Sequence, residues 1–189
     1  MKKYELTAEF IEQWGKKLFR IKALISFGSV EAGELGGYVE KEDNLAQDGD
    51  AWVYGNARVC DDARVCGDAR VYGNARVYGD AWVCDNAWVC GNARVCDNAR
   101  VCDNADYLLI GRIGSRFSFT TFFKNKDKGI TVSCGCFLGT IAEFRAKVTD
   151  THGNNKHAKM YNLAADMAEL QILGEEHFDK LNTNKSEPF

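Results

Sequence analysis

The chain has 189 residues, 46% of them hydrophobic and 27% charged, a composition typical of one folded domain or a compact core with small appendages. The formal net charge of −3 provides no overall attraction to nucleic acid or to an anionic membrane surface. No apolar run approaches the roughly 20 residues of a membrane helix, and the first residues do not resemble a signal peptide, so we expect a cytoplasmic protein with no membrane partner.

Residues 1–34 are predicted to form an N-terminal β cap. Two segments rich in aromatic and aliphatic residues, 10–14 and 17–21, flank Gly15 and Lys16, which predicts a β-hairpin. A cap is expected here because the repeat that follows would otherwise leave its first backbone edge open.

From residue 47 to residue 106 the chain advances in ten consecutive six-residue units. The first position is Val in nine units, from Val53 to Val101, and the fifth is Ala in all ten, from Ala51 to Ala105. The third position is Gly or Asp and the fourth is Asp or Asn. A period of six fits short strands joined by sharp corners. Val and Ala are predicted to point inward, and the Gly/Asp and Asn/Asp pairs to form the corners.

This pattern resembles the left-handed β-helix of the hexapeptide-repeat family, whose motif is aliphatic–x–x–x–small–x. In that family three hexads make one triangular turn, so the resemblance implies that residues 18 apart stack on one face. Two looser hexads, 35–40 and 41–46, extend the repeat upstream and predict a β-helix of about four turns over residues 35–106. The handedness rests on the resemblance alone.

Residues 107–174 are predicted to form an α+β appendage with three strands and two helices. The strands are expected at 107–110, 117–123 and 130–137. The first helix begins at a capping box, Thr140 to Glu143, and extends to about residue 148. The second helix spans about 155–173, and its leucines and methionine lie near one apolar face: Leu163, Met167, Leu170 and Leu173. Gly174 ends this helix, and residues 175–189 are expected to form a flexible tail.

Three motifs in this appendage resemble the closing segment of uncharacterised hexapeptide-repeat proteins of bacteria and their prophages. They are Ile-Gly-x-x-Gly-Ser-Arg at 110–116, Gly-Cys-Phe-x-Gly-Thr at 135–140 and Thr-His-Gly at 151–153. That group has no established activity, so the resemblance implies a fold but no chemistry.

Catalysis is not expected. Hexapeptide-repeat acyltransferases use a His general base near the coil, but the three histidines of this chain, His152, His157 and His177, all lie outside it. No long loop interrupts the hexads to form an acceptor pocket. His152 is interpreted as a structural residue at a helix end, and no cofactor is expected.

The eight cysteines are expected to be reduced thiols, because no signal peptide is recognised. The 18-residue spacing should stack Cys66, Cys84 and Cys102 in one column, which could bind a soft metal. However, the second hexad position holds only Tyr or Cys after the first unit, a single-base difference typical of a drifting duplication. No metal site is therefore predicted. Cys134 and Cys136 are interpreted as small hydrophobic residues on one face of a strand.

The sixth hexad position predicts columns of arginine and tryptophan. The three expected columns are Arg58, Arg76 and Arg94; Arg64, Trp82 and Arg100; and Trp52, Arg70 and Trp88. Stacked like charges repel unless corner aspartates or aromatic rings offset them. The simpler interpretation is that these groups of the protein itself offset the repulsion. The alternative is that the arginines bind a phosphate, a nucleotide or an acidic protein surface. Six Arg against ten Asp in the coil argue against long nucleic acid.

A second candidate anion site is the segment 111–116. Its two glycines and the side chains of Arg112, Ser115 and Arg116 could cradle a phosphate. No Walker lysine completes the pattern, so a tight hinge between coil and cap is the simpler interpretation.

The function expected from the sequence is that of a non-enzymatic, oligomeric binding or scaffold protein. Large aromatic residues on the coil surface predict contacts between copies, in a trimer first and a dimer second. These residues are Trp52, Trp82, Trp88, Tyr54, Tyr72 and Tyr78. The alternatives are a prophage-type, anti-defence protein that sequesters an anion or nucleotide through its arginine columns, and an acyltransferase.

Overall fold

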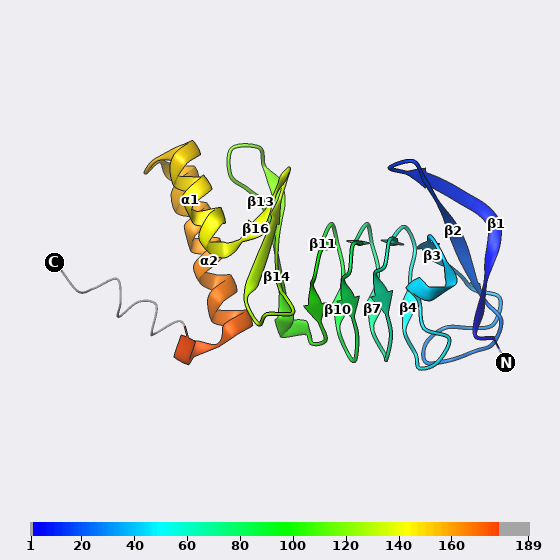
Figure 1. Cartoon of the computed structure of the whole chain (residues 1–189). Coiled ribbons are helices and arrows are strands. Elements are labelled where there is room, and N and C mark those ends of the chain that lie inside the picture. The colour runs from blue at the N-terminus through cyan, green and yellow to red at the C-terminus, as the bar shows by residue number, and fades with distance from the viewer. Residues whose placement is uncertain (1, 178–189) are drawn as a thin grey trace. The chain divides into compact units, whose positions relative to one another are not determined.

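The computed structural model describes residues 2–177 and divides the chain into two compact units between Asn104 and Ala105 (Figure 1). The first unit contains an N-terminal hairpin and a β-solenoid. The second contains a sheet and two helices. No helix in the described part combines the length and apolar character needed to cross a membrane.

The first unit begins with the predicted hairpin. Strands β1 (Tyr4–Gln13) and β2 (Lys16–Ala23) pair antiparallel, and β3 (Leu35–Val39) pairs with the other edge of β2. The hairpin turns at Trp14 and Gly15, both with positive φ. Because β3 also pairs with the solenoid strand β5, the hairpin extends one side of the solenoid.

The hexads form a β-solenoid of about four turns over residues 38–101. Each two-residue strand pairs in parallel with the strand one turn further on, and this produces three sheets, with orders β3-β5-β8-β11, β4-β7-β10 and β6-β9-β12. The strands are β4 (Trp52–Val53), β5 (Arg58–Val59), β6 (Arg64–Val65), β7 (Arg70–Val71), β8 (Arg76–Val77), β9 (Trp82–Val83), β10 (Trp88–Val89), β11 (Arg94–Val95) and β12 (Arg100–Val101).

The interior of the solenoid is built from the two predicted inward positions. The hexad valines from Val53 to Val101 and the alanines from Ala51 to Ala99 are fully buried. Ala105 is exposed, because the regular coil gives way to the short helix η2 (Asn104–Asp106). The prediction for this last alanine was wrong.

The register predicted for the two upstream hexads was also wrong. Val39 pairs with Val59, and Leu45 forms a bridge with Val65, so these partners lie 20 residues apart instead of 18. The predicted register would have placed Leu35, which is exposed, and a lysine in the interior. The first turn therefore contains two extra residues, and its aliphatic side chains occupy the valine sites.

Asn44 compensates for this irregular first turn. In later turns the carbonyl oxygens of Asp85 and Ala69 accept from the backbone N–H groups 17 residues earlier. For Asp61 and Ala63 the corresponding N–H groups are those of Asn44 and Ala46, which donate to other carbonyl oxygens. The side-chain amide of Asn44 donates to the carbonyl oxygens of Asp61 and Ala63 instead, at 3.0 and 2.8 Å. Asn44 lies in the short helix η1 (Glu42–Asn44) and is fully buried.

Lys3 satisfies carbonyl groups at the open end of the solenoid. Its ammonium donates to the carbonyl oxygens of Asp48, Gly49 and Ala51, at 3.2, 3.2 and 3.0 Å. Burial lowers the pKa of Lys3 from 10.5 to about 8.

The second unit contains an antiparallel sheet of four strands, not three, in the order β13-β14-β15-β16. They are β13 (Tyr107–Ile113), β14 (Ser118–Lys124), β15 (Ile130–Cys134) and β16 (Phe137–Thr140). The strand predicted at 130–137 is divided by a turn at Gly135 and Cys136, where Gly135 has φ +62°. Residues 114–117 join β13 to β14, so they form a turn within the sheet and not the predicted hinge.

The helices α1 (Ile141–His152) and α2 (Lys156–Leu173) pack on one face of this sheet (Figure 1). The capping box of Thr140 and Glu143 is confirmed, and α1 continues four residues beyond its predicted end. The buried face of α2 consists of small residues with one aromatic and one aliphatic side chain: Ala158, Tyr161, Ala164, Ala165, Ala168 and Ile172. The predicted apolar face lies in solvent instead, except for the partly buried Leu173. Residues 178–189 of the predicted tail lie outside the described part.

Candidate functional site

The first candidate site is the arginine column on the solenoid. The strand register places Arg76 directly between Arg58 and Arg94, as predicted. Within residues 2–177, Arg58 and Arg76 form no ion pair: Arg58 donates to the side-chain oxygen of Gln13 at 2.6 Å, and Arg76 lies 5.7 Å from the centre of the Trp14 ring. Burial, reinforced by the neighbouring arginine charges, lowers the pKa of Arg76. The hairpin thus offsets part of the repulsion internally.

The other two columns alternate arginine with tryptophan. Arg64 and Arg100 lie on the two sides of Trp82, at 5.9 and 4.9 Å from its ring. Arg70 lies 5.1 Å from the ring of Trp88. These cation–π contacts provide the aromatic offset that the sequence predicted.

The aromatic residues predicted to contact other copies differ in accessibility. Trp52 is completely buried against Tyr4 and Phe27, so its side chain presents no surface to another molecule. Trp82 and Trp88 are 41% and 45% exposed. The remaining predicted residues are partly buried: Tyr54, Tyr72 and Tyr78.

The cysteine column contains a disulfide between Cys84 and Cys102, so the expectation of eight reduced thiols was wrong for this pair. The 18-residue spacing brings their Cα atoms to 4.5 Å in adjacent turns, which is within disulfide range.

A separate cluster brings together Glu40, Cys60 and Asp61. Lys16 pairs with both carboxylates. Burial raises the pKa of the Cys60 thiol to about 12, which disfavours the thiolate that a metal would need. This arrangement is an ion-pair network centred on lysine.

The second candidate site is a cleft of about 440 Å³ in the second unit. Three parts of the unit form its walls: the β13–β14 turn with the start of β14, the β15–β16 turn, and α1 with Tyr161 of α2. The lining residues are Ser115, Arg116, Ser118, Cys134, Gly135, Cys136, Phe137, Phe144, Lys147, Val148, Thr151, His152 and Tyr161. Residues from all three sequence motifs therefore meet at one cleft.

Tyr161 fixes the position of the first motif. A Cβ atom on Gly114 would lie only 1.8 Å from the Tyr161 hydroxyl, so glycine is required for this close approach. Ser115 and Arg116 follow and line the cleft, whereas Arg112 is exposed on β13 and does not. Ser115 and Arg116 could be identified as candidates from the sequence. Lys147 and Tyr161 could not, because only the helix packing brings them to the cleft.

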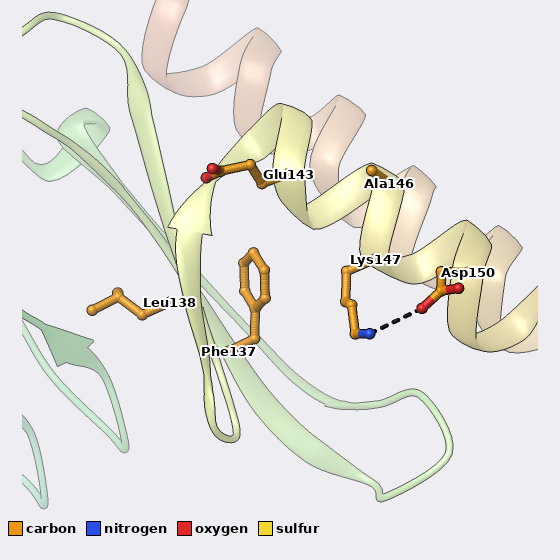
Figure 2. A pocket seen from close by; sticks show the side chains of 6 residues that line it. All are labelled: Phe137, Leu138, Glu143, Ala146, Lys147 and Asp150. Atoms are coloured by element: carbon orange, nitrogen blue, oxygen red, sulfur yellow. Dashed lines mark hydrogen bonds and ion pairs between the residues drawn. The ribbon is translucent and has the colours of Figure 1, made fainter.

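A neighbouring hollow of about 470 Å³ lies between α1 and β16. Figure 2 shows Phe137 between the strand and the helix, and Leu138 pointing away from it. The ammonium of Lys147 is paired with Asp150 at 2.9 Å. The carboxylate of Glu143 accepts hydrogen bonds from the backbone N–H and the hydroxyl of the N-cap residue, Thr140. The charged groups of this hollow thus pair with one another or with the helix N-terminus, and within residues 2–177 no unpaired charge lines it.

The hexad spacing, the three parallel sheets and the Val/Ala interior define a β-solenoid repeat protein. Two overlapping segments, residues 63–79 and 69–85, match the family described as YdcK Beta solenoid repeat. No curated protein matches the chain.

Proposed function

We propose that this chain is a non-enzymatic, self-associating binding protein. The observation that carries the proposal is an apolar stripe on the solvent side of α2. The stripe consists of Met160, Leu163, Met167 and Leu170, and Leu163 and Met167 are 63% and 57% exposed. Contiguous apolar surface of this kind marks interaction sites.

The spacing of the stripe fits another helix. Its residues follow one another at intervals of three, four and three positions, the spacing of the contact seam in coiled coils. The opposite side of α2 already forms the core of the unit. The stripe is therefore available for a contact outside the fold.

The charges of α2 favour a second copy of the same helix in antiparallel orientation. Lys156 and Lys159 are exposed in its first turn, and Glu175 and Glu176 are exposed beyond its last turn. Antiparallel pairing brings the lysines of each copy close to the glutamates of the other, and the two contacts are equivalent by twofold symmetry. This arrangement favours a dimer over the trimer that the sequence suggested first.

Size-exclusion chromatography with light scattering tests this proposal. We expect twice the chain mass of 21.1 kDa for the wild type at micromolar concentration, and a monomer for the double variant Leu163→Glu, Met167→Glu. Leu138→Glu is the control, because Leu138 is also an exposed leucine, at 47%, and lies outside the stripe. A monomeric wild type, or a dimer that survives the double substitution, contradicts the proposal. A monomer that dimerises only after deletion of residues 178–189 assigns the stripe to the tail and also contradicts it.

The solenoid is proposed as the surface that binds a protein partner, and two features support this role. Trp82 and Trp88 expose large rings, and the hexad motif resembles that of the left-handed hexapeptide-repeat proteins. The motifs at 110–116, 135–140 and 151–153 resemble uncharacterised prophage members of that group. Substitution of both tryptophans by serine should abolish binding of an identified partner and leave the dimer intact. An experimental structure with a right-handed coil would contradict the proposed type of solenoid.

Binding of an anionic small molecule or nucleotide to the arginine column is a second candidate. Its support is that Arg58 and Arg76, within the described residues, have no carboxylate partner. A thermal shift with nucleotides that persists in Arg76→Ala and Arg94→Ala would exclude this site.

A further inference from the structure

We infer that the cleft in the second unit binds a small organic anion with an aromatic body, such as a nucleoside monophosphate or an aromatic carboxylate. This site is separate from the solenoid columns and from the helix stripe. The inference rests on the charge of the lining residues, the character of the cleft wall and its volume.

Two cationic side chains, Arg116 and Lys147, line the cleft, and within residues 2–177 no carboxylate is among the lining side chains. Within residues 2–177, Arg116 forms no hydrogen bond or ion pair, although its charge acts on the nearby Tyr161, so its guanidinium donors are free for a ligand. The guanidinium group suits bidentate binding of carboxylate or phosphate. Ser115 and Ser118 also line the cleft, and their hydroxyl groups offer further donors.

Lys147 provides a second, adjustable cation. Its ion pair with Asp150 is exposed, with side-chain exposures of 62% and 72%. Exposed pairs of this kind contribute little stability, so the ammonium can turn toward a ligand at small cost. Asp150 itself does not line the cleft.

The remaining wall is aromatic. Phe144 packs against both Phe137 and Tyr161, with ring centres 5.5 and 5.6 Å apart, and His152 stacks on Tyr161. Phe144 and Tyr161 are buried, whereas Phe137 and His152 are partly exposed. Inorganic phosphate would leave these two partly exposed rings uncovered. A volume of about 440 Å³ falls within the range of small-molecule sites and admits an aromatic ring together with its charged group.

Calorimetric titration of the full chain with AMP and with phenylacetate tests the inference. We expect one or both to bind with a Kd below about 1 mM. The one that binds identifies the anionic group as phosphate or carboxylate. Arg116→Gln should weaken binding at least about tenfold. Arg112→Gln is the matched control, because Arg112 lies on the adjoining strand outside the cleft, and it should leave the Kd unchanged.

A second measurement needs no charge substitution. Cys136 is an exposed free thiol in the cleft, while Cys66 and Cys90 are partly buried on the solenoid. A saturating ligand should slow alkylation of Cys136 severalfold and leave the two solenoid thiols unaffected, and Cys136→Ser assigns the signal. The inference is overturned if neither AMP nor phenylacetate binds, or if Arg116→Gln binds the ligand as well as the wild type does. It is also overturned if AMP binds but inorganic phosphate or adenosine binds as tightly, if phenylacetate binds but acetate binds as tightly, or if the bound ligand does not protect Cys136.

Discussion

The side chain of Asn44 provides the sharpest test of how the solenoid begins. Replacement by alanine removes the two hydrogen bonds to the carbonyl oxygens of Asp61 and Ala63. It also removes the acceptor for the Lys41 N–H, at 2.9 Å. A buried carbonyl left without a donor costs about 1–3 kcal/mol, whereas the Lys41 N–H lies near the surface and can bond to water. We therefore expect Asn44→Ala to lower the free energy of unfolding of the first unit by about 3 kcal/mol.

Urea denaturation followed by tryptophan fluorescence measures this loss directly. All four tryptophans lie at or before residue 88, so the signal reports the first unit alone. With m of about 1–3 kcal/mol/M, the midpoint should fall by roughly 1–3 M. Asn74→Ala is the control, because Asn74 is an exposed corner residue of the same solenoid and should change stability by less than about 0.5 kcal/mol. Equal midpoints for the two variants would refute the compensating role of Asn44.

Two further predictions concern a buried thiol and a buried ion pair. Burial, and then the charge of Asp61, raise the pKa of the Cys60 thiol from 9.0 to about 12 in the folded state. As pH rises, the thiol therefore loses its proton in the unfolded chain first, and stability is lost between pH 9 and pH 12. Between pH 9 and pH 11 the wild type should lose about 2 kcal/mol more than Cys60→Ala in urea titrations, and parallel losses would contradict this. Arg145 bridges Asp166 and the nearly buried Glu169, both at 2.7 Å, so Arg145→Met should cost about 2 kcal/mol. Circular dichroism at 222 nm follows the helices of the second unit during this unfolding, and a loss no larger than that of the exposed-pair variant Lys147→Met would count against it.

The fold of the regular hexads could be predicted from sequence because the two inward positions of the hexad carry nearly invariant side chains. Val and Ala fill a narrow interior. The turn of 18 residues, which only the resemblance to the hexapeptide-repeat family implied, then fixes every outward column, including Arg64, Trp82 and Arg100. The irregular first turn could not be read in this way. There Val39 and Leu45 replace valine two residues out of phase, and the shift becomes visible only through strand pairing.

The orientation of α2 was predicted wrongly for a different reason. Its sequence contains two apolar faces, and hydrophobicity alone selects the face with larger side chains. The space beside the sheet is already occupied by the rings of Phe122 and Phe144, so alanines fit there and Leu163 does not. Which face of α2 is buried depends on the volume left beside the sheet, and the sequence of the helix alone does not contain that information.

The cleft could not be predicted from the sequence because it depends both on strand pairing and on the orientation of α2. Each of its motifs is visible in the sequence, but their meeting depends on the strand order and on the side of α2 that faces α1. Arg116 and Tyr161 illustrate this: they are 45 positions apart, and only the turn at Gly114 brings the first to the second. The fourth strand, β16, was not predicted, and its turn with β15 brings Cys136 and Phe137 to the same cleft.

The uniform interior of the solenoid separates its architecture from its surface chemistry. Because each hexad offers the same two inward groups, any hexad can occupy any of the three sides without disturbing the packing. Insertion or removal of 18 residues would lengthen or shorten the coil by one turn and keep each column aligned. An insertion or removal of six residues would move every later residue of the coil to the next side. Gene slippage in whole units could therefore recombine guanidinium, indole, phenol and thiol groups into new surfaces while the protein continues to fold.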